Sequence, residues 1–270
     1  RVGDLDGNAA KIKKFATKAK GVDLIVTSEL ALLGYPPRDL LLYPNFIAEA
    51  WGTLQTLARE TKLLPPILVG IATVNKNKKG RPLFNCAAFL KDGKIQEVFH
   101  KSLLPTYDVF DEDRYFEPGQ QSKILKFNGK KIGISICEDL WNDRDFWHRP
   151  RYHFDPIEKL VEEKADLVIN LSSSPFTVDK QNLREAMIAA SAKKYKVPIL
   201  YVNQVGGNDD LIFDGASVAF SKHGKLIARA KAFEEDILII DPLGSDPINH
   251  SSRKGWTLNK YPVGSEAIFK

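Results

Sequence analysis

The sequence is short of several residue types and patterns that mark common classes of protein. Only two cysteines occur among 270 residues, too few for a disulfide framework, and five histidines are poor ground for a structural zinc site. No run approaches the roughly 20 consecutive apolar residues that a membrane-spanning helix needs. No charged-then-apolar secretory leader opens the chain. We therefore expect a cytoplasmic protein without a metal site and without a membrane contact.

Charge of one sign is also scarce. The chain has 39 Lys and Arg against 34 Asp and Glu, a net charge of +5 that is spread along the sequence. A nucleic-acid-binding protein usually concentrates positive charge on one face, so we expect no nucleic-acid partner. Residues 141–151 combine Trp, His and Arg, but interleaved aspartates dilute their charge. We interpret this segment as an active-site or subunit-contact loop, and we expect a homo-oligomer.

Helix-like and strand-like segments alternate along the chain. Apolar residues at helical spacing and short β-branched runs define the two kinds of segment, and Asn8 is the expected N-cap of the first helix. The Asp92-Gly93 pair between two strand-like runs predicts a hairpin. This alternation predicts α/β layers with helices covering a mixed sheet or sheets. The expected helices lie at 8–19, 47–58, 156–164 and 179–196, and the expected strands at 23–28, 67–74, 83–90, 94–99, 130–136, 166–171, 198–203, 216–220, 225–230 and 236–240.

The periodicity ends near Pro242. The residues that follow are rich in Gly, Pro, Ser and Asn. We therefore divide the chain into a folded domain over residues 1–242 and an irregular tail or truncated linker over residues 243–270.

Three strand-like runs each end in a residue that can take part in catalysis. Glu29 follows residues 23–28, Lys101 follows the run that ends at 99–100, and Cys137 follows 130–136. Active sites of layered α/β folds often lie at strand ends, because the sheet is rigid and its loops vary. Taken singly, each residue also fits a structural role: a solvated Glu, an edge Lys, a small buried Cys. Cys86, which has no charged neighbour in sequence, is assigned that structural role.

Together the three residues make chemical sense. A thiol attacks a carbonyl carbon as the thiolate, so it needs a base or a cation nearby. A Glu that is partly removed from water can take the thiol proton and return it to the leaving group. A Lys ammonium and a backbone N–H can neutralise the oxyanion of the tetrahedral intermediate. Cys, Glu and Lys thus suffice to hydrolyse an amide through a thioester, without histidine, metal or cofactor.

Longer motifs around these residues resemble a known family. Glu29 within SELALLGYPPRDLL, Lys101 within HKSLLPTYDVFDEDRYFEPG and Cys137 within GISICEDLWND resemble the catalytic segments of the nitrilase, or carbon–nitrogen hydrolase, superfamily. The opening GDLDGN, the YDVFDE segment at 107–112 and NQVGG at 203–207 are similar to one branch, the glutaminase domains of glutamine-dependent NAD synthetases. The resemblance covers about residues 2–242. It implies an αββα four-layer sandwich.

The resemblance also implies a role for individual residues. Glu29 is the expected base, Lys101 the oxyanion stabiliser, Cys137 the nucleophile, and Glu112 the auxiliary carboxylate that orients the Lys. Glu138 resembles the carboxylate that receives a substrate α-ammonium, and its N–H is the expected second oxyanion donor. The other residues expected to bind glutamine are Tyr35, Tyr107, Phe110, Ser174 and Lys180.

Two of these substrate contacts leave alternatives open. Phe110 stands in a loop where an aromatic ring can line the pocket or simply pack the loop. Lys180 stands where the branch often carries an Arg, and Lys lacks the bidentate fork that suits a carboxylate. Arg184, one helical turn further on, is the alternative clamp for the substrate α-carboxylate.

The resemblance implies a glutamine amidohydrolase that supplies ammonia for NAD synthesis from nicotinic acid adenine dinucleotide. The expected partners are glutamine and an ATP-dependent synthetase domain or subunit. That domain is not expected within these residues, because no SGG-x-D-S loop occurs. The similar Val205-Gly206-Gly207-Asn208-Asp209 lacks the leading serine, and we interpret it as a flexible turn near the pocket.

Two other functions remain possible from the sequence. One is a nitrilase-type amidase on another amide, such as an ω-amidase or a carbamoylase. The other is a catalytically silent interaction module of the same fold.

Overall fold

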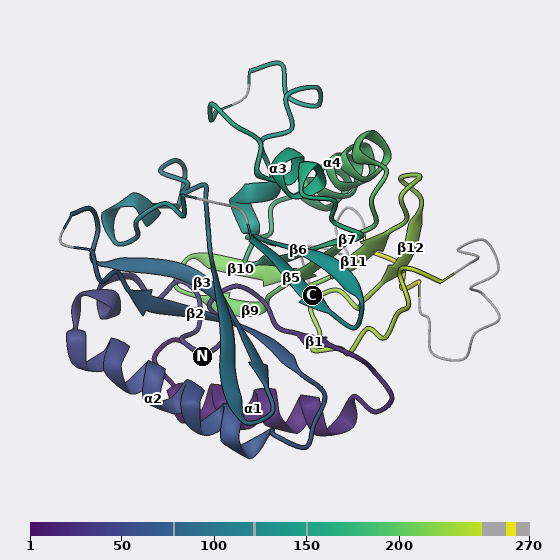
Figure 1. Cartoon of the computed structure of the whole chain (residues 1–270). Helices are drawn as coiled ribbons and strands as arrows, with labels where there is room; N and C mark the ends of the chain where they lie inside the picture. The colour runs from purple at the N-terminus through teal and green to yellow at the C-terminus, as the bar shows by residue number, and fades with distance from the viewer. Residues whose placement is uncertain (78, 121–122, 150, 245–257, 263–270) are drawn as a thin grey trace. The chain divides into compact units, whose positions relative to one another are not determined.

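The computed structural model describes residues 1–77, 79–120, 123–149, 151–244 and 258–262 of the chain. It divides into two compact units, Arg1–Gln121 and Ser122–Lys270 (Figure 1). Each unit combines a β-sheet with helices, as the alternation of helix-like and strand-like segments predicts. No helix of the described ranges is long and apolar enough to cross a bilayer.

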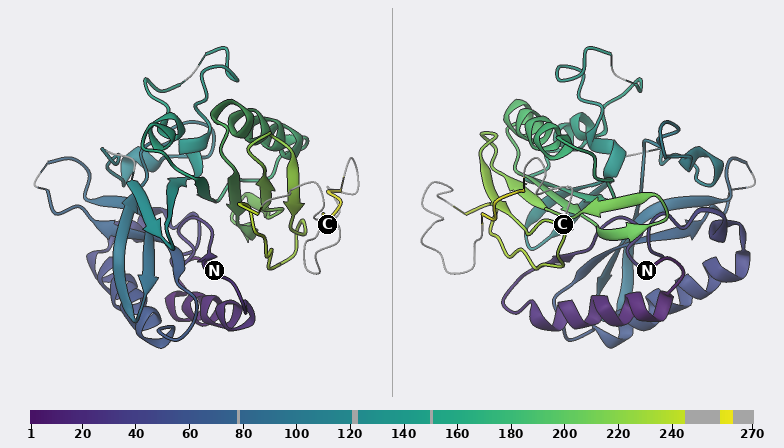
Figure 2. Two further views of the ribbon diagram at one scale, coloured as in Figure 1. Left: turned by 45° about the vertical axis from the view of Figure 1, so that its right-hand side comes forward. Right: turned by 180° about the vertical axis from the view of Figure 1, so that it is seen from behind.

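The first unit contains a four-stranded sheet in the order β1-β2-β3-β4. The first two strands pair in parallel and the others antiparallel. Helices α1 and α2 lie together along one face of this sheet (Figure 2), and α2 buries a stripe of apolar residues there, the stripe predicted from the sequence. The elements are α1 (Leu5–Lys18), β1 (Ile25–Val26), η1 (Arg38–Leu42), α2 (Pro44–Glu60), β2 (Ile67–Val74), β3 (Leu83–Lys91), β4 (Lys94–His100) and η2 (Glu112–Arg114).

The β3–β4 hairpin is confirmed at the predicted position. Asp92 and Gly93 have φ of +52° and +78°, so both residues of the connection lie in the left-handed region. That conformation matches the twist of the two flanking strands and favours Asp-Gly. The hairpin pairs His100 at the end of β4 with Cys86, so Lys101 lies beside Asn85 near the start of β3.

The second unit contains a six-stranded sheet in the order β12-β11-β8-β7-β6-β5. Its centre is parallel, since β6, β7 and β8 run in one direction and are joined through α3 and α4. Their carboxyl ends therefore lie at one edge of the sheet, where α/β proteins commonly place functional residues. The elements are β5 (Lys123–Phe127), β6 (Lys130–Ile136), η3 (Cys137–Leu140), α3 (Pro156–Glu162), β7 (Leu167–Ser172), α4 (Lys180–Tyr195), β8 (Ile199–Asn203), β9 (Val205–Asn208), β10 (Leu211–Asp214), β11 (Val218–Phe220) and β12 (Leu226–Arg229).

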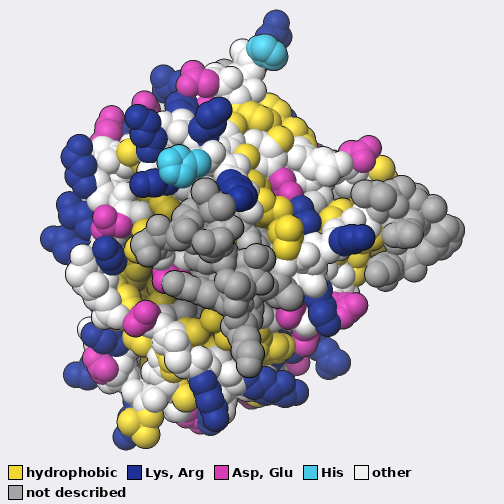
Figure 3. Space-filling model, turned by 90° about the vertical axis from the view of Figure 1, so that its right-hand side faces the viewer, with side chains coloured by type: hydrophobic (Ala, Val, Ile, Leu, Met, Phe, Trp, Pro, Cys, Tyr) yellow, Lys and Arg dark blue, Asp and Glu magenta, His cyan; other side chains and the backbone are white. Residues whose placement is uncertain are grey.

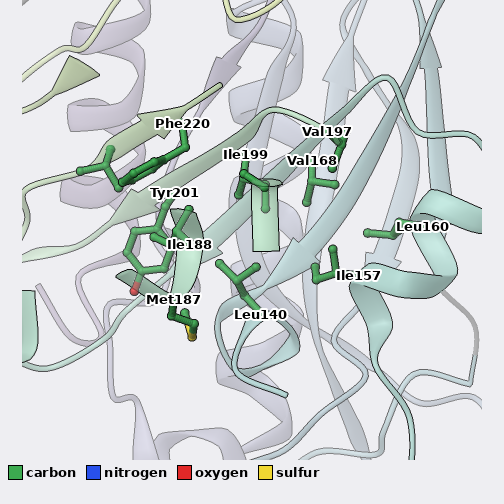
Figure 4. Close-up of a cluster of buried hydrophobic side chains, with 12 residues drawn as sticks. Leu140, Ile157, Leu160, Val168, Met187, Ile188, Val197, Ile199, Tyr201 and Phe220 are labelled. Carbon is green, nitrogen blue, oxygen red and sulfur yellow. The ribbon is translucent and has the colours of Figure 1, made fainter. Parts of the chain in front are cut away.

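A cluster of apolar side chains fixes α3, α4 and η3 to this sheet. It combines branched aliphatic residues of the strands with residues of the helices, and Figure 4 shows ten of them labelled. Each full burial of such a side chain is worth about 1.5–3 kcal/mol relative to exposure. The cluster therefore holds the strand ends in a rigid frame. Its buried members are Leu140, Ile157, Leu160, Val168, Met187, Ile188, Ala192, Val197, Ile199, Tyr201, Val218 and Phe220.

The surface shows mixed charge. On the face drawn in Figure 3, Lys and Arg side chains are interspersed with Asp and Glu. This agrees with the even spread of charge in the sequence.

Several expectations for secondary structure are wrong. The first helix is capped by Asp4, whose carboxylate accepts from the Gly7 N–H, and Asn8 lies inside the helix, where it bonds to the carbonyls of Arg1 and Leu32. The strand expected at 23–28 is only Ile25–Val26, and residues 236–240 form no strand.

The expected turn at 205–209 is also wrong. Gly206 and Gly207 lie in β9, which pairs with β10 as an antiparallel hairpin. Strand β5 was not expected, and it pairs with β6.

Most of the expected tail, 243–270, lies outside the described residues. Residues 258–262, which belong to the second unit, contact the end of β12. Leu258 forms an isolated bridge with Arg229, and the Asn259 side chain donates to the Arg229 carbonyl at 3.0 Å.

Candidate active site

The turn that carries Glu29 is fixed by close contact with β2. The carbonyl of Gly70 accepts from the Leu32 N–H at 3.1 Å, and a Cβ at Gly70 would lie 2.4 Å from Leu30 N and from Ser28 O. Only glycine therefore allows the turn to approach this strand. Leu30 itself has φ of +46°, which turns the chain away directly after Glu29. The Glu29 side chain is fully buried.

Lys101 follows β4 and is held through its main chain on both sides. Its N–H donates to the Asn85 carbonyl at 2.8 Å, and its carbonyl accepts from the Gly119 N–H at 2.7 Å. A Cβ at Gly119 would lie 2.9 Å from the Lys101 carbonyl oxygen, so this contact also requires glycine. Lys101 Nζ lies 2.7 Å from Glu29 Oε1, and neither side chain is exposed.

Glu112, at the start of η2, completes this cluster. Its Oε1 and Oε2 accept from Lys101 Nζ at 2.9 and 2.8 Å. Burial raises the pKa of Glu112 from 4.5 to about 7; the Lys101 charge opposes this rise and the Glu29 charge adds to it. Two carboxylates facing one ammonium thus form a buried group that can exchange a proton near neutral pH.

Two further side chains donate to the carboxylates. Tyr35 Oη donates to Glu112 Oε1 at 3.1 Å, so this buried residue, predicted to line a pocket, also belongs to the charged cluster. Asn85 Nδ2 lies 2.8 Å from Glu29 Oε1 and 3.5 Å from Glu112 Oε2. Sequence reasoning missed Asn85. We call Glu29, Lys101, Glu112, Tyr35 and Asn85 the carboxylate cluster.

The other two predicted pocket aromatics of the first unit pack against each other. The rings of Tyr107 and Phe110 are 5.7 Å apart in an edge-on arrangement, in the loop before η2. The carbonyl of Tyr107 accepts from the Phe110 N–H at 3.0 Å, and Asp108 between them has φ of +57°. This tight turn brings the two rings together.

In the second unit, Cys137 occupies the carboxyl end of β6. It is buried and has φ of +42°, a conformation in which a non-glycine residue is strained. Hydrogen bonds hold the strained turn. The Ile136 N–H donates to Asp139 Oδ2 at 3.0 Å, and Asn170 Nδ2 donates to the Cys137 carbonyl at 3.4 Å. Such a turn presents a nucleophile at the end of a rigid strand.

Glu138 is buried beside Cys137, and a tyrosine contacts it. Its Oε1 accepts from Tyr152 Oη at 3.1 Å. Tyr152 is anchored by Asn142, whose side chain exchanges two hydrogen bonds with the Tyr152 backbone, at 3.0 and 3.1 Å. The sequence offered only a weak signal for Tyr152, since it directly follows the Trp-, Arg- and Asp-containing segment interpreted as a loop.

Ser174 follows β7 at the same edge of the sheet and is held by two residues. Asn203, at the end of β8, accepts from the Ser174 N–H at 2.9 Å, and Arg184 donates to Ser174 Oγ at 3.3 Å. Arg184 is fully buried and forms an ion pair with Asp214 at 3.1 Å. Its charge is therefore matched within the protein, which disfavours it as the alternative clamp for a substrate carboxylate.

Lys180 begins α4 in the same unit. Its Nζ lies 5.9 Å from the centre of the Trp141 ring, a cation–π distance. It is partly exposed, unlike Arg184.

The structure thus groups the predicted residues within each unit. Glu29, Lys101 and Glu112 share one cluster in the first unit, and Cys137 and Ser174 follow neighbouring parallel strands in the second. The missed residues Asn85, Tyr152 and Asn203 all act through side-chain hydrogen bonds. No set of three or more His, Cys, Asp or Glu side chains in the described ranges is arranged to hold a metal ion.

Comparison with protein families gives one match along most of the chain. The family profile described as "Carbon-nitrogen hydrolase" matches residues 1–242. Among curated proteins, the glutamine-dependent NAD(+) synthetase of Synechocystis sp. is 46% identical over 246 residues, which cover 88% of this chain and 44% of that protein. The protein of the same name from Aquifex aeolicus is 37% identical, with 88% and 40% covered. The chain therefore spans less than half the length of these relatives.

Solved structures give the same result for the fold. A glutamine-dependent NAD+ synthetase from Acinetobacter baumannii, in complex with ADP, is 37% identical with a TM-score of 0.77 and covers 87% of this chain and 42% of that one. An amidase from Nesterenkonia sp. is 20% identical with a TM-score of 0.69, covering 86% and 82%. At that identity the likeness concerns the fold alone. The α/β fold is that of the nitrilase superfamily, as the motifs around Glu29, Lys101 and Cys137 predict.

Proposed function

Because the chain belongs to the carbon–nitrogen hydrolase family, we propose that it is a glutamine amidohydrolase that releases ammonia through a thioester on Cys137. The observation that carries this proposal is the carboxylate cluster: a fully buried Glu29 that shares the Lys101 ammonium with Glu112. A buried acid–base group of this kind has no evident structural use, because apolar residues would pack the site at lower cost.

In the proposed reaction Glu29 takes the proton of the Cys137 thiol, and the thiolate attacks the carbonyl carbon of the glutamine side-chain amide. Lys101 and a backbone N–H stabilise the oxyanion of the tetrahedral intermediate. Glu29 returns the proton to the nitrogen as the C–N bond breaks, and ammonia leaves. Water, deprotonated by Glu29, then hydrolyses the thioester to glutamate and the free thiol. No cofactor takes part in this scheme.

Glu112 and Tyr35 have supporting roles in this proposal. Glu112 fixes the ammonium through both carboxylate oxygens, and Tyr35 fixes Glu112. Because Glu112 has a pKa of about 7, it is also able to share a proton with the Glu29–Lys101 pair during turnover.

Three residues of the second unit are proposed to recognise the free amino-acid end of glutamine. Glu138, buried beside the nucleophile, receives the α-ammonium. Ser174 and Lys180 hold the α-carboxylate end, and Lys180 is the partly exposed cation there, whereas Arg184 is paired with Asp214. Tyr107 and Phe110 are proposed to line the same substrate's path.

The ammonia is proposed to serve NAD synthesis from nicotinic acid adenine dinucleotide, with an ATP-dependent synthetase domain or subunit as partner. This rests on the relatives named glutamine-dependent NAD(+) synthetase, of which the present chain spans 40–44%.

Replacement of the two cysteines tests the nucleophile. Cys137→Ala should abolish ammonia release from glutamine, and because one sulfur atom contributes little packing, the free energy of unfolding should change by about 1 kcal/mol. Cys86→Ala is the matched control. This buried thiol in β3 lies 3.1 Å from Thr73 Oγ1, so its loss should affect stability similarly and activity hardly at all. Equal loss of activity in both variants, at equal folding, would contradict the assignment.

A further inference from the structure

Asn85 joins all three charged members of the carboxylate cluster. It lies in β3, with its side chain buried. Its main-chain carbonyl accepts from the Lys101 N–H at 2.8 Å, and its side-chain amide nitrogen faces Glu29 Oε1 at 2.8 Å and Glu112 Oε2 at 3.5 Å. One residue therefore touches the backbone of the cation and the side chains of both anions.

The orientation of the amide is dictated by its neighbours. Carboxylate oxygens only accept when ionised, so the NH₂ group must face them and the amide oxygen must point the other way. That oxygen, Asn85 Oδ1, is buried and has no hydrogen-bond partner among the described residues. A buried acceptor left unpaired is unfavourable and rare.

The unpaired oxygen favours a positioning role for Asn85 over a purely structural one. A leucine of similar shape would fill the same space in β3 without an unsatisfied atom. The side chain thus stabilises the fold poorly for a buried residue, while its nitrogen supplies a donor to both carboxylates. Unsatisfied or strained groups of this kind cluster at functional sites.

We propose that Asn85 is a positioning residue of the amide hydrolysis: its side-chain amide donates to Glu29 and holds it aligned as the base, and its carbonyl fixes Lys101. The proposal rests on the proposed function of the cluster. A donor to an ionised carboxylate favours the charged form, so its removal raises the pKa of that carboxylate. The groups that face Glu29 and Glu112 in this cluster are Lys101, Tyr35 and each other, and Asn85 is the neutral donor that contacts both.

The test is the pH dependence of glutamine hydrolysis by Asn85→Leu in the full chain. The base must be ionised to act, so the acidic limb of kcat/KM should move up by about one pH unit, and kcat/KM at a fixed pH on that limb should fall about tenfold. The fold should be retained, since the unpaired oxygen is lost together with the donor. Asn85→Ala, which adds no bulk, should shift the limb in the same direction.

Asn75→Leu is the matched control. Asn75 is a buried asparagine of the same unit, but within the described ranges its side chain bonds to the backbone of residues 77, 79 and 81 alone. Its replacement should lower the melting temperature and leave the acidic limb in place. An unchanged limb in both Asn85 variants, with active wild-type protein, would overturn the proposal.

A second measurement does not depend on turnover. Carboxyl ¹³C resonances of the glutamates, followed through a pH titration, should show upward-shifted buried carboxyls in Asn85→Leu relative to wild type. If wild type does not hydrolyse glutamine but these shifts occur, the proposed function fails and the role of Asn85 in the cluster stands. If wild type is active and the shifts do not occur, the inference on Asn85 fails alone.

Discussion

Each unit of the chain contains a fully buried ionic cluster among its described residues, and these two clusters are built differently. In the first unit Lys101 faces two carboxylates, Glu29 and Glu112. In the second unit Arg184 faces one, Asp214, which also accepts from Asn203 and from Tyr261 Oη at 2.8 Å. One cluster has an excess of negative charge, whereas the other is balanced, with Asp214 accepting from three side chains.

This difference indicates which role each cluster is suited to. A charge-balanced pair ties elements together: Arg184 comes from α4, Asp214 from β10 and Asn203 from β8. A cation with two carboxylates instead leaves one proton to be shared: burial raises the pKa of Glu112 to about 7, against the Lys101 charge and with the help of the Glu29 charge. The Arg184–Asp214 pair is therefore suited to a structural role, and the carboxylate cluster is suited to proton transfer.

Removal of the Lys101 charge should have the largest effect. Lys101→Met leaves Glu29 and Glu112 buried without a cation, so the proposed oxyanion stabiliser is lost and turnover should fall by about 10³ or more. The free energy of unfolding at pH 8 should fall by about 3–5 kcal/mol, because an unpaired buried charge remains. Steady-state ammonia release and urea denaturation check both numbers.

Lys101→Arg is the companion variant. A planar guanidinium cannot take the place of a compact ammonium between two carboxylates, so this variant should fail almost as badly. Near-normal turnover in either variant would remove Lys101 from the mechanism.

Loss of the Arg184 charge should lower stability and leave the rate of the chemical step nearly unchanged. Arg184→Met should lower the free energy of unfolding by about 3–5 kcal/mol, because Asp214 is left buried and unpaired. In the folded protein kcat should stay within about threefold of wild type while KM rises, since Ser174 loses a donor and the reacting groups do not. Kinetics at a temperature where the variant is folded provide the measurement.

An ion pair that joins the same helix to β12 is the control for that variant. Arg229 and Glu185 lie 2.7 Å apart but are partly exposed. Arg229→Gln should therefore cost about 1 kcal/mol or less and leave KM unchanged. A drop in kcat with Arg184→Met as large as that with Lys101→Met would show that the two clusters do not differ as described.

The smallest expected effect is a change in the pH dependence of stability. The pKa of Glu112 rises from 4.5 to about 7 on folding, so the folded state binds the proton more tightly than the unfolded state. Its contribution to stability is complete below about pH 4.5 and is lost as the pH rises through 7. At about 1.4 kcal/mol per pKa unit, the loss is at most about 3 kcal/mol.

Glu112→Gln, which cannot titrate, should remove this dependence. Urea midpoints of both proteins at pH 5 and pH 8 should show wild type losing stability relative to the variant on going to pH 8. An equal change in urea midpoint for wild type and variant between pH 5 and pH 8 would mean that Glu112 stays ionised in the folded protein over this range.

Much of the frame of these clusters could be predicted from the sequence. The runs that precede Glu29, Lys101 and Cys137 are apolar and β-branched and end in polar residues, so the strand ends were recognisable. The strands at 67–74 and 130–136 were predicted with the bounds that the structure shows. Local patterns suffice here because burial and turn chemistry act on neighbouring residues.

The long-range hydrogen bonds could not be predicted. Asn85 and Glu29 are 56 positions apart in the chain, and the register of β3 against β2 and the packing of the Glu29 turn on Gly70 bring them together. Gly206 and Gly207 indicated a turn, yet pairing with β10 makes them a strand. Residues 236–240 have a strand-like composition but pair with no strand in the part of the chain that the structure describes, so composition alone misled there.

The preference between glutamine and butyramide, measured as the ratio of their kcat/KM values, tests the central claim most directly. A site in which Glu138 receives an α-ammonium and Ser174 and Lys180 hold the α-carboxylate end leaves those groups unpaired when butyramide binds, so glutamine should be preferred by at least about 10³. Hydrolysis of both should vanish in Cys137→Ala. Comparable rates for the two amides with a working Cys137 would contradict the account and indicate a general amidase.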